Sequence, residues 1–321
     1  TEAQYAALQP RLAARKADGF VREGHGDLHL GNIAMAGSDP IIFDGIEFNP
    51  ALRWIDTISE VAFVVMDLEH RRRFGLARCF IDTYLEQSGD FTGLSLLPMY
   101  KVYRAMVRAK VNAIRLAQNH LGAEERRQAL TEHGILLSLA ESYVRPHAPA
   151  ILITHGLSGS GKSRLAEILV RRLPAVRIRS DVERKRLFGL GADARTGSDL
   201  ESGIYTPAAT LATYGRLLEL ADQITGAGET LVVDATFLDP LQRQRFRQLA
   251  ARKGLPFLVL SVRAPERVLR ERLLARRALG ADPSDAHAGV LAPQSAPQPP
   301  LAPAESEQTL VFDTGQHIPP N

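Results

Sequence analysis

The chain has 321 residues, of which 45% are hydrophobic and 23% are charged, and its formal net charge is +3. This length exceeds one typical hydrophobic core and predicts two domains, while the composition excludes a chain that is disordered throughout. A net charge this small allows anionic substrates but does not by itself indicate nucleic-acid binding.

The sequence carries no pattern typical of a membrane or secreted protein. No apolar run approaches the ~20 residues of a membrane span, and the first residues lack the basic-then-apolar pattern of a signal peptide. The single cysteine, Cys79, cannot form a disulfide within the chain, which is typical of a reducing compartment. We therefore expect a cytoplasmic protein with no membrane partner. The sequence defines no oligomeric state.

The first predicted elements are a helix, a hairpin and a long helical region. Residues 1–18 have apolar side chains at helical spacing, and Asp18-Gly19 ends that helix. A hairpin is predicted in NIAMAGSDPIIFDGIEF, with its turn at 37–40 and its second strand at 41–43. Helical periodicity then continues from 51 to about 144.

A kinase-like loop precedes the hairpin, with the sequence HGDLHLGN at 25–32. The spacing from Asp27 to Asn32 equals that of the H-R-D-x-x-x-x-N catalytic loop of protein kinases. In such a loop Asp27 would orient or deprotonate an acceptor hydroxyl and Asn32 would bind magnesium. Asp44 ends the strand IIFD, where the metal-binding aspartate of D-F-G would lie. The alternative is a chance H-G-D loop.

The loop with Asp27 and Asn32, together with the later Asp44, resembles the aminoglycoside phosphotransferase family. The resemblance implies that residues 1–145 form the mostly helical C-lobe of a kinase fold. Kinases of this class also need a glycine-rich loop and a lysine on an N-lobe strand, whereas the residues before His25 predict a single helix. We therefore expect no N-lobe here, either because the chain is a fragment or because the lobe has been lost. The first residue, Thr1, fits a fragment or the removal of an initiator. We do not expect phosphotransfer by this region alone.

A second domain is predicted after a short proline-containing linker at 146–150. From 151 to 321, short apolar runs alternate with helical ones, which predicts a parallel sheet flanked by helices and an α/β fold overall. The Pro/Ala/Gln-rich stretch at 292–305 is predicted to be a loop or linker on the surface.

The strongest motif is GLSGSGKS at 156–163, which fits G-x-x-x-x-G-K-[ST] between a predicted strand and a predicted helix. The backbone of such a loop closes around phosphate oxygens at a helix N-terminus. The predicted ATP-binding residues are Gly156, Ser158, Gly159, Ser160, Gly161, Lys162 and Ser163. Lys162 would reach the β- and γ-phosphates, and the Ser163 hydroxyl would bind Mg²⁺. The alternative is a chance Gly/Ser loop.

Two carboxylates follow predicted strands in this domain. Asp234 ends TLVVD, where a Walker B aspartate would hold the magnesium. Asp181 ends VRIRSD and could accept the proton of an incoming hydroxyl. For each of them, capping of the following helix is the alternative interpretation.

A basic helix is predicted in PERVLRERLLARRALG, with Arg272, Arg276 and Arg277 as candidates to neutralise charge on the phosphates. A solvated basic face is the alternative. From 151 to about 315, the chain resembles the small P-loop kinases related to polynucleotide, gluconate and shikimate kinases. The resemblance implies that Asp181 contacts the acceptor hydroxyl and that Arg272 and Arg276 belong to the lid.

The leading hypothesis is an ATP-dependent kinase that transfers the γ-phosphate of Mg²⁺-ATP to a hydroxyl of a small molecule. The alternative is an ATP-binding or ATP-hydrolysing switch, with the front half as an interaction module. Nucleic-acid end phosphorylation is disfavoured though still open, because no basic stripe with interleaved aromatics is present. The stretch at 193–210 occupies the place where such kinases often shape the acceptor pocket, but the sequence does not name the acceptor.

Overall fold

The structure of the protein is a computed structural model. It describes residues 2–118, 121–145, 148–192, 194, 203–279, 301 and 303–315. The chain divides into two compact units. The first unit comprises Thr1–Ile81 and Thr92–Pro146, and the second comprises Asp82–Phe91 and His147–Asn321. The predicted fold class is confirmed, because a mostly helical region precedes a domain with a parallel sheet flanked by helices.

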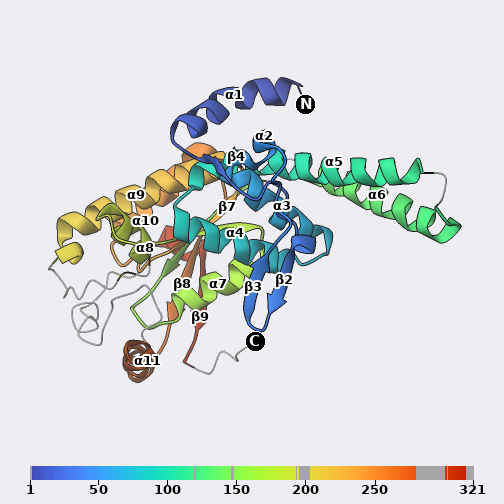
Figure 1. Cartoon of the computed structure of the whole chain (residues 1–321). Helices are drawn as coiled ribbons and strands as arrows, with labels where there is room; N and C mark the ends of the chain where they lie inside the picture. The colour runs from blue at the N-terminus through green and yellow to red at the C-terminus, as the bar shows by residue number, and fades with distance from the viewer. Residues whose placement is uncertain are drawn as a thin grey trace. The chain divides into compact units, whose positions relative to one another are not determined.

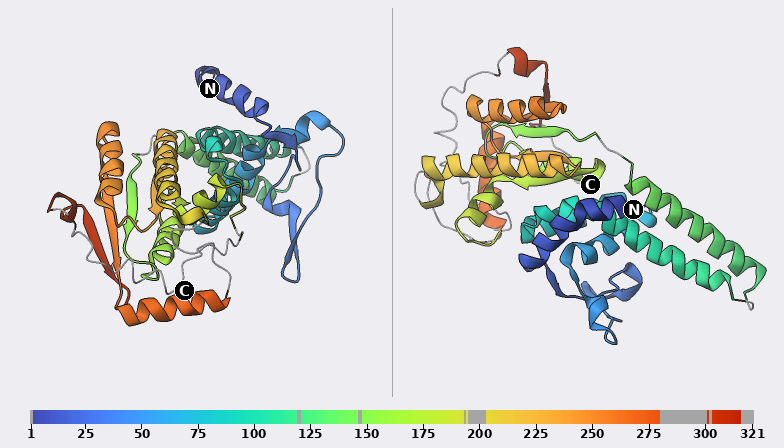
Figure 2. Two further views of the ribbon diagram at one scale, coloured as in Figure 1. Left: turned by 90° about the vertical axis from the view of Figure 1, so that its left-hand side faces the viewer. Right: turned by 90° about the horizontal axis from the view of Figure 1, so that it is seen from above.

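The first unit is mostly helical. Its long helices include α5 and α6, which run side by side in Figure 1 and in the right-hand view of Figure 2. Helix α3 packs against α5, and its Phe63 and Met66 join Ala105 and Leu136 in a buried cluster. The elements before residue 146 are α1 (Glu2–Ala17), β1 (Val21–Glu23), η1 (Leu30–Asn32), β2 (Ile33–Ala36), β3 (Asp39–Ile42), α2 (Pro50–Arg53), β4 (Trp54–Asp56), α3 (Thr57–His70), α4 (Phe74–Ser88), η2 (Phe91–Ser95), α5 (Leu97–Leu116) and α6 (Ala123–Tyr143). The end of α4, from Asp82 onward, belongs to the second unit.

The predicted hairpin is present, but its turn is shorter than expected. Strands β2 and β3 pair Ala36 with Asp39, so the turn consists of Gly37 and Ser38 alone. Pro40 lies inside β3, opposite Met35. A proline is tolerated there because each strand of this described two-stranded ribbon has an outer edge that needs no amide donor. The short antiparallel pair of β1 with β4 was not predicted.

The second unit contains, among its described residues, a five-stranded sheet in the order β6-β7-β5-β8-β9. Each neighbouring pair of strands is parallel. The elements from residue 147 onward are β5 (Ile151–His155), α7 (Lys162–Arg172), β6 (Ala175–Arg179), α8 (Ser180–Leu187), η3 (Gly203–Tyr205), α9 (Pro207–Gly226), β7 (Thr230–Asp234), α10 (Pro240–Lys253), β8 (Phe257–Arg263), α11 (Glu266–Leu279), α13 (Pro303–Ser306) and β9 (Thr309–Asp313).

Both faces of this sheet are covered. On one face, Leu152 and Val232 pack with Ala166 of α7. Their neighbours along the strands, among them Ile153 and Val233, point to the opposite face and are fully buried as well. Helix α9 contacts β7, and α10 contacts α9 and β5. The inner strands β5, β7 and β8 are continuous apolar runs because each of them is covered on both faces, whereas the outer strand β9 is largely exposed.

The predicted surface linker at 292–305 is only partly described. Residues 292–300 and 302 lie outside the described residues, whereas the end of the stretch enters the short helix α13. Its Glu305 is buried and accepts hydrogen bonds from Arg243 Nε at 2.7 Å and Nη2 at 3.1 Å. Arg243 Nη1 also donates to the Phe237 carbonyl at 2.9 Å. This end of the stretch is thus a structural anchor for the loop that follows β7.

None of the helices within the described ranges combines the length and apolar content needed to cross a lipid bilayer.

The buried pair of Arg243 with Glu305 predicts a large cost for its disruption. Glu305→Ala leaves the Arg243 guanidinium buried without its carboxylate, so we expect the free energy of unfolding to fall by about 3 kcal/mol. Urea denaturation followed by circular dichroism measures this change. Glu307→Ala is the matched control, because Glu307 is exposed on the same segment. Equal effects of the two variants would contradict a structural role for the pair.

Candidate nucleotide and acceptor site

The predicted phosphate-binding loop joins β5 to α7. Gly156 has φ +139°, and a Cβ there would collide with the Val262 carbonyl oxygen of β8. Gly161 precedes the first residue of α7 with φ +98°, in the left-handed region. Both positions therefore need glycine, and the loop turns tightly enough to present backbone N–H groups at the start of a helix.

Helix α7 begins with Lys162, the predicted phosphate-binding residue, and Ser163, the predicted metal ligand. Lys162 is 8% exposed, and its Nζ donates to the Leu157 carbonyl at 2.7 Å, so the lysine lies back over the loop. Ser163 follows it and is half-buried. Ser160 is almost fully buried, and its Oγ has no hydrogen-bond partner among the described residues. The loop thus holds polar atoms that a bound phosphate could satisfy.

The parallel sheet brings the two predicted carboxylates to the edge where the loop begins. Strand β7 lies between β6 and β5, and Arg179 pairs with Asp234 in the parallel register. Asp181 lies two residues beyond Arg179, so both carboxylates follow the carboxyl ends of adjacent strands. Ligands of α/β proteins bind at this edge of the sheet.

Asp234 is 5% exposed, and its Oδ2 accepts no hydrogen bond from any described residue. The Nε of Arg179 lies 3.8 Å from this oxygen. A buried carboxylate oxygen without a hydrogen bond is costly unless a cation binds it. The alternative role as a helix cap is wrong, because Asp239 caps the following helix α10.

A magnesium ion fits this donor set. Hard oxygen ligands are those that Mg²⁺ prefers, and Asp234 and Ser163 both supply them. Among the described residues, no group of three or more His, Cys, Asp or Glu side chains forms a ready-made metal cage. Mg²⁺ commonly keeps several waters and binds one or two protein groups together with substrate phosphates, and a P-loop supplies such a setting.

Asp181 lies in the first turn of α8 and is half-buried. It does not cap this helix, because α8 begins at Ser180 with Arg179 as its N-cap. Arg184 follows three residues later on the same face of the helix, and it is buried. Burial lowers the pKa of Arg184, and the nearby Asp181 carboxylate opposes that shift. Asp181 and Arg184 therefore both lie on the acceptor side of the sheet edge.

Arg184 and Tyr214 also lie on the acceptor side of the sheet edge, and neither was predicted from the sequence as a site residue. Arg184 Nη1 donates to the Ile204 carbonyl at 3.0 Å, and its guanidinium lies 5.0 Å from the centre of the Tyr205 ring. Tyr214 is buried, and its hydroxyl accepts a hydrogen bond from the Phe237 N–H at 3.1 Å. Arg184 could have been found from its i+3 spacing to Asp181, whereas Tyr214 carries no local signal.

The predicted acceptor-pocket stretch at 193–210 is described only in part. Residue 193 and residues 195–202 lie outside the described residues. In the described portion, the Thr206 hydroxyl caps helix α9 by accepting a hydrogen bond from the Ala209 N–H at 3.2 Å.

The predicted lid arginine Arg272 lies against the phosphate-binding loop. Its Nη1 is 3.4 Å from the Gly159 carbonyl and 2.9 Å from the Thr314 hydroxyl, and its Nη2 donates to the Thr314 carbonyl at 2.7 Å. Thr314 in turn donates to the Ser160 carbonyl at 2.7 Å. Arg276 and Arg277 belong to the same helix α11, but their side chains lie outside the described part of the chain.

The kinase-like loop of the first unit brings its predicted residues together. Asn32 Nδ2 donates to the Asp27 carbonyl at 3.0 Å, and the Phe43 N–H donates to the Asn32 carbonyl at 3.1 Å. Asp44 therefore follows directly beside Asn32, and its backbone adopts φ +62°, which is unusual for a residue with a side chain. His25 accepts from the Asp27 N–H and bonds the Phe43 carbonyl. His25 therefore holds the backbone of this loop through both ring nitrogens.

The second unit matches a known family. Residues 151–301 match AAA_33, an AAA domain. This match agrees with the loop and the parallel sheet described above, which are those of a P-loop domain.

Most of the chain is similar to the uncharacterized protein Rv2004c of Mycobacterium tuberculosis (strain ATCC 25618 / H37Rv), with 32% identity over 285 residues. The match covers 89% of this chain but 56% of the relative, so the chain spans little more than half the length of the curated relatives it matches. Two solved structures are similar to part of the chain. One, from Chloroflexus aurantiacus J-10-fl, has 26% identity and a TM-score of 0.41, covering 53% of this chain and 87% of that one. The other is the APS kinase of M. tuberculosis in complex with AMPPNP and APS, with 22% identity and a TM-score of 0.39, covering 54% and 92%.

His155, at the base of the loop, predicts an acid-sensitive stability. Burial and then the nearby charges of Arg243 and Lys162 lower its pKa to about 4. The unfolded chain binds this proton near pH 6.5, so its contribution to stability is present above that pH and is lost as the pH falls toward 4. His155→Gln should reduce the loss of unfolding free energy between pH 7 and pH 5, as measured by urea denaturation. An unchanged difference between the two pH values would contradict this assignment.

Proposed function

We propose that the protein is an ATP-dependent phosphotransferase whose active site is the P-loop domain and whose acceptor is a hydroxyl of a small molecule. The observation that carries this proposal is the meeting of three features at one edge of the sheet. These are the glycine-rich loop after β5, the Asp234 oxygen that no described residue satisfies, and the Asp181 carboxylate after β6.

The loop residues would bind the nucleotide. Backbone N–H groups from Gly156 to Ser163 would surround the phosphates, and the Lys162 ammonium would pair with the β- and γ-phosphates. Ser163 and Asp234 would hold the magnesium ion, which when bound neutralises charge on the phosphate oxygens. Arg272 adds positive charge from the other side of the loop, because its guanidinium already lies at the Gly159 carbonyl.

The acceptor would enter from the side of α8. Its hydroxyl oxygen forms the new bond to the γ-phosphorus, the bond from that phosphorus to the β–γ bridging oxygen breaks, and ADP leaves. Asp181 orients the hydroxyl and accepts its proton. Arg184 would place a positive charge near this carboxylate.

For the first unit we propose a kinase-like catalytic loop that does not bind nucleotide within this chain. In this proposal Asp27 would be the catalytic aspartate of the loop, and Asn32 and Asp44 would be its two metal ligands. Among the described strands of this unit, β1 to β4, none carries a lysine that could hold the phosphates.

Nucleotide binding tests the assignment to the P-loop. Lys162→Ala removes a charge-assisted contact to the phosphates and should weaken Mg²⁺-ATP binding by about tenfold or more in titration calorimetry. Asp44→Ala is the matched variant in the first unit and should leave binding unchanged. A binding event that survives Lys162→Ala and disappears with Asp44→Ala would contradict the proposal, because it would place a nucleotide site in the first unit.

The role of Asp181 distinguishes a kinase from an ATP-dependent switch. Asp181→Asn should keep Mg²⁺-ATP binding but lower the rate of phosphate transfer by about 10²-fold or more. Phosphorus NMR of the protein with Mg²⁺-ATP and pools of hydroxyl compounds measures the transfer. If the protein hydrolyses ATP without labelling any acceptor and Asp181→Asn does not change the rate, the switch is the better account.

A further inference from the structure

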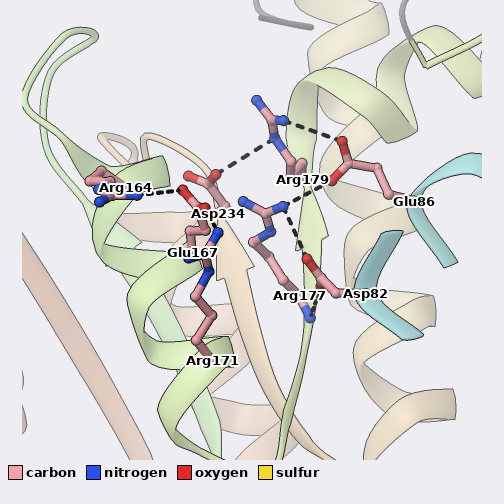
Figure 3. Close-up of polar contacts among 8 residues, drawn as sticks. All are labelled: Asp82, Glu86, Arg164, Glu167, Arg171, Arg177, Arg179 and Asp234. Carbon is pink, nitrogen blue, oxygen red and sulfur yellow. Dashed lines mark hydrogen bonds and ion pairs between the residues drawn. The ribbon is translucent and has the colours of Figure 1, made fainter. Parts of the chain in front are cut away.

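A segment from early in the chain belongs to the P-loop domain. Residues Asp82–Phe91, which include the last turns of α4, fall within the second unit. Asp82 and Glu86 are four residues apart and therefore lie on the same face of this helix. That face contacts β6, the outer strand of the sheet as described, and Figure 3 shows both carboxylates directed toward it.

Asp82 binds the outer strand itself. Its Oδ1 accepts a hydrogen bond from the Arg177 N–H at 3.2 Å, and its Oδ2 lies 3.0 Å from Arg177 Nη2. The backbone amide at the edge of the sheet is thus satisfied by a side chain in place of another strand. Arg177 Nη2 also lies 3.1 Å from Glu86 Oε2.

Arg179 connects Glu86 to the candidate metal ligand. Its Nη1 lies 3.3 Å from Glu86 Oε1, and its Nε lies 3.8 Å from Asp234 Oδ2 (Figure 3). Arg179 and Asp234 are direct partners in the parallel register, so their side chains emerge on the same face of the sheet. At 9% and 5% exposure, these charges interact more strongly than surface pairs do.

A guanidinium at this place has two opposing effects. It compensates the buried Asp234 carboxylate while no metal is bound, and it repels a divalent cation that approaches the same oxygen. The pairing of Arg179 with Glu86 limits both effects, because the guanidinium is shared between two carboxylates.

We propose that Glu86 is a positioning residue for the metal site, which acts by holding Arg179 away from full pairing with Asp234. This inference rests on the proposed function, since it assigns to Asp234 the binding of the magnesium that accompanies ATP. It makes the metal affinity of the P-loop domain depend on the end of α4, which comes far earlier in the sequence than the phosphate-binding loop.

The helix end is also held by contacts that do not involve the Glu86 carboxylate. Arg186 Nη2 donates to the Glu86 carbonyl at 2.6 Å. Its side chain also packs against Gly89, where a Cβ would lie 2.8 Å from Arg186 Nε. Asp82 adds its two contacts to Arg177. Replacing the Glu86 carboxylate alone therefore leaves the segment attached, and a substitution can separate positioning from packing.

The experiment measures ATP binding by titration calorimetry at a series of free Mg²⁺ concentrations and with no Mg²⁺. In Glu86→Gln, Arg179 loses its contact with the Glu86 carboxylate and pairs more fully with Asp234. We expect the half-saturating Mg²⁺ concentration to rise about tenfold, while ATP binding without Mg²⁺ changes little. In a chain that already carries Arg179→Met, adding Glu86→Gln should not change the half-saturating Mg²⁺ concentration any further.

Glu167→Gln is the matched control. Glu167 pairs with Arg164 and Arg171 within helix α7 (Figure 3), so its loss removes similar ion pairs without touching Arg179. Its Mg²⁺ dependence should equal that of the unsubstituted chain. Should Glu86→Gln fail to fold, Glu86→Asp keeps the charge but shortens the side chain, and it should raise the half-saturating concentration in the same direction.

Three results would overturn the inference: an unchanged Mg²⁺ dependence in Glu86→Gln, an additive effect in the double variant, or an equal shift in Glu167→Gln. Each of these leaves the proposed function standing, because Mg²⁺-ATP still binds to the unsubstituted chain. If the unsubstituted chain binds no Mg²⁺-ATP, the proposed function fails and this inference fails with it.

Discussion

The carboxylate of Asp234 is buried at the end of β7, and one of its oxygens accepts no hydrogen bond from the residues that the structure describes. Such an atom destabilises the fold unless a positive charge compensates it. The parallel register of β6 against β7 supplies Arg179 as its direct partner, at a distance that leaves the contact incomplete. The end of β7 therefore holds a buried carboxylate whose charge Arg179 compensates only in part.

Other features of the second unit are consistent with a place for nucleotide phosphates beside this charge. The loop before α7 turns tightly enough to exclude side chains at Gly156, and the Lys162 and Arg272 side chains lie against its carbonyl groups. His155 stays neutral beneath the loop because burial and neighbouring cations disfavour its protonation. The cations near the loop are thus carried by arginine and lysine, whose charge does not change at neutral pH.

The sequence was sufficient to predict the parts of the site that depend on local patterns. The phosphate-binding loop has fixed spacing between a strand and a helix, and Asp234 and Asp181 each follow a short apolar run. Parallel strands bring such residues to one edge, which is why their meeting could be expected. The kinase-like loop at Asp27 and Asn32 was also predicted from spacing, and its contact with the turn at Asp44 follows from the hairpin.

The contacts that could not be predicted join residues far apart in sequence. The sequence around Glu86 predicts an exposed position on an amphipathic helix. No neighbouring residue indicates that its carboxylate contacts Arg179, which lies much later in the sequence. Glu305 lies at the end of a Pro/Ala/Gln-rich stretch whose composition predicts a surface loop, yet it is buried against Arg243. The predicted turn of the hairpin is too long because proline favours turns, whereas here Pro40 lies at an outer strand edge that tolerates it.

The central claim is that Asp234 and the phosphate-binding loop together hold a metal–nucleotide complex. Electron paramagnetic resonance of Mn²⁺, used in place of Mg²⁺, tests it most directly, because it counts the bound metal with and without ATP. We expect each chain to bind one Mn²⁺ tightly when ATP is present. Asp234→Asn should weaken this Mn²⁺ binding by about tenfold or more while the protein stays folded. The same Mn²⁺ binding in Asp234→Asn as in the unsubstituted chain would contradict the account.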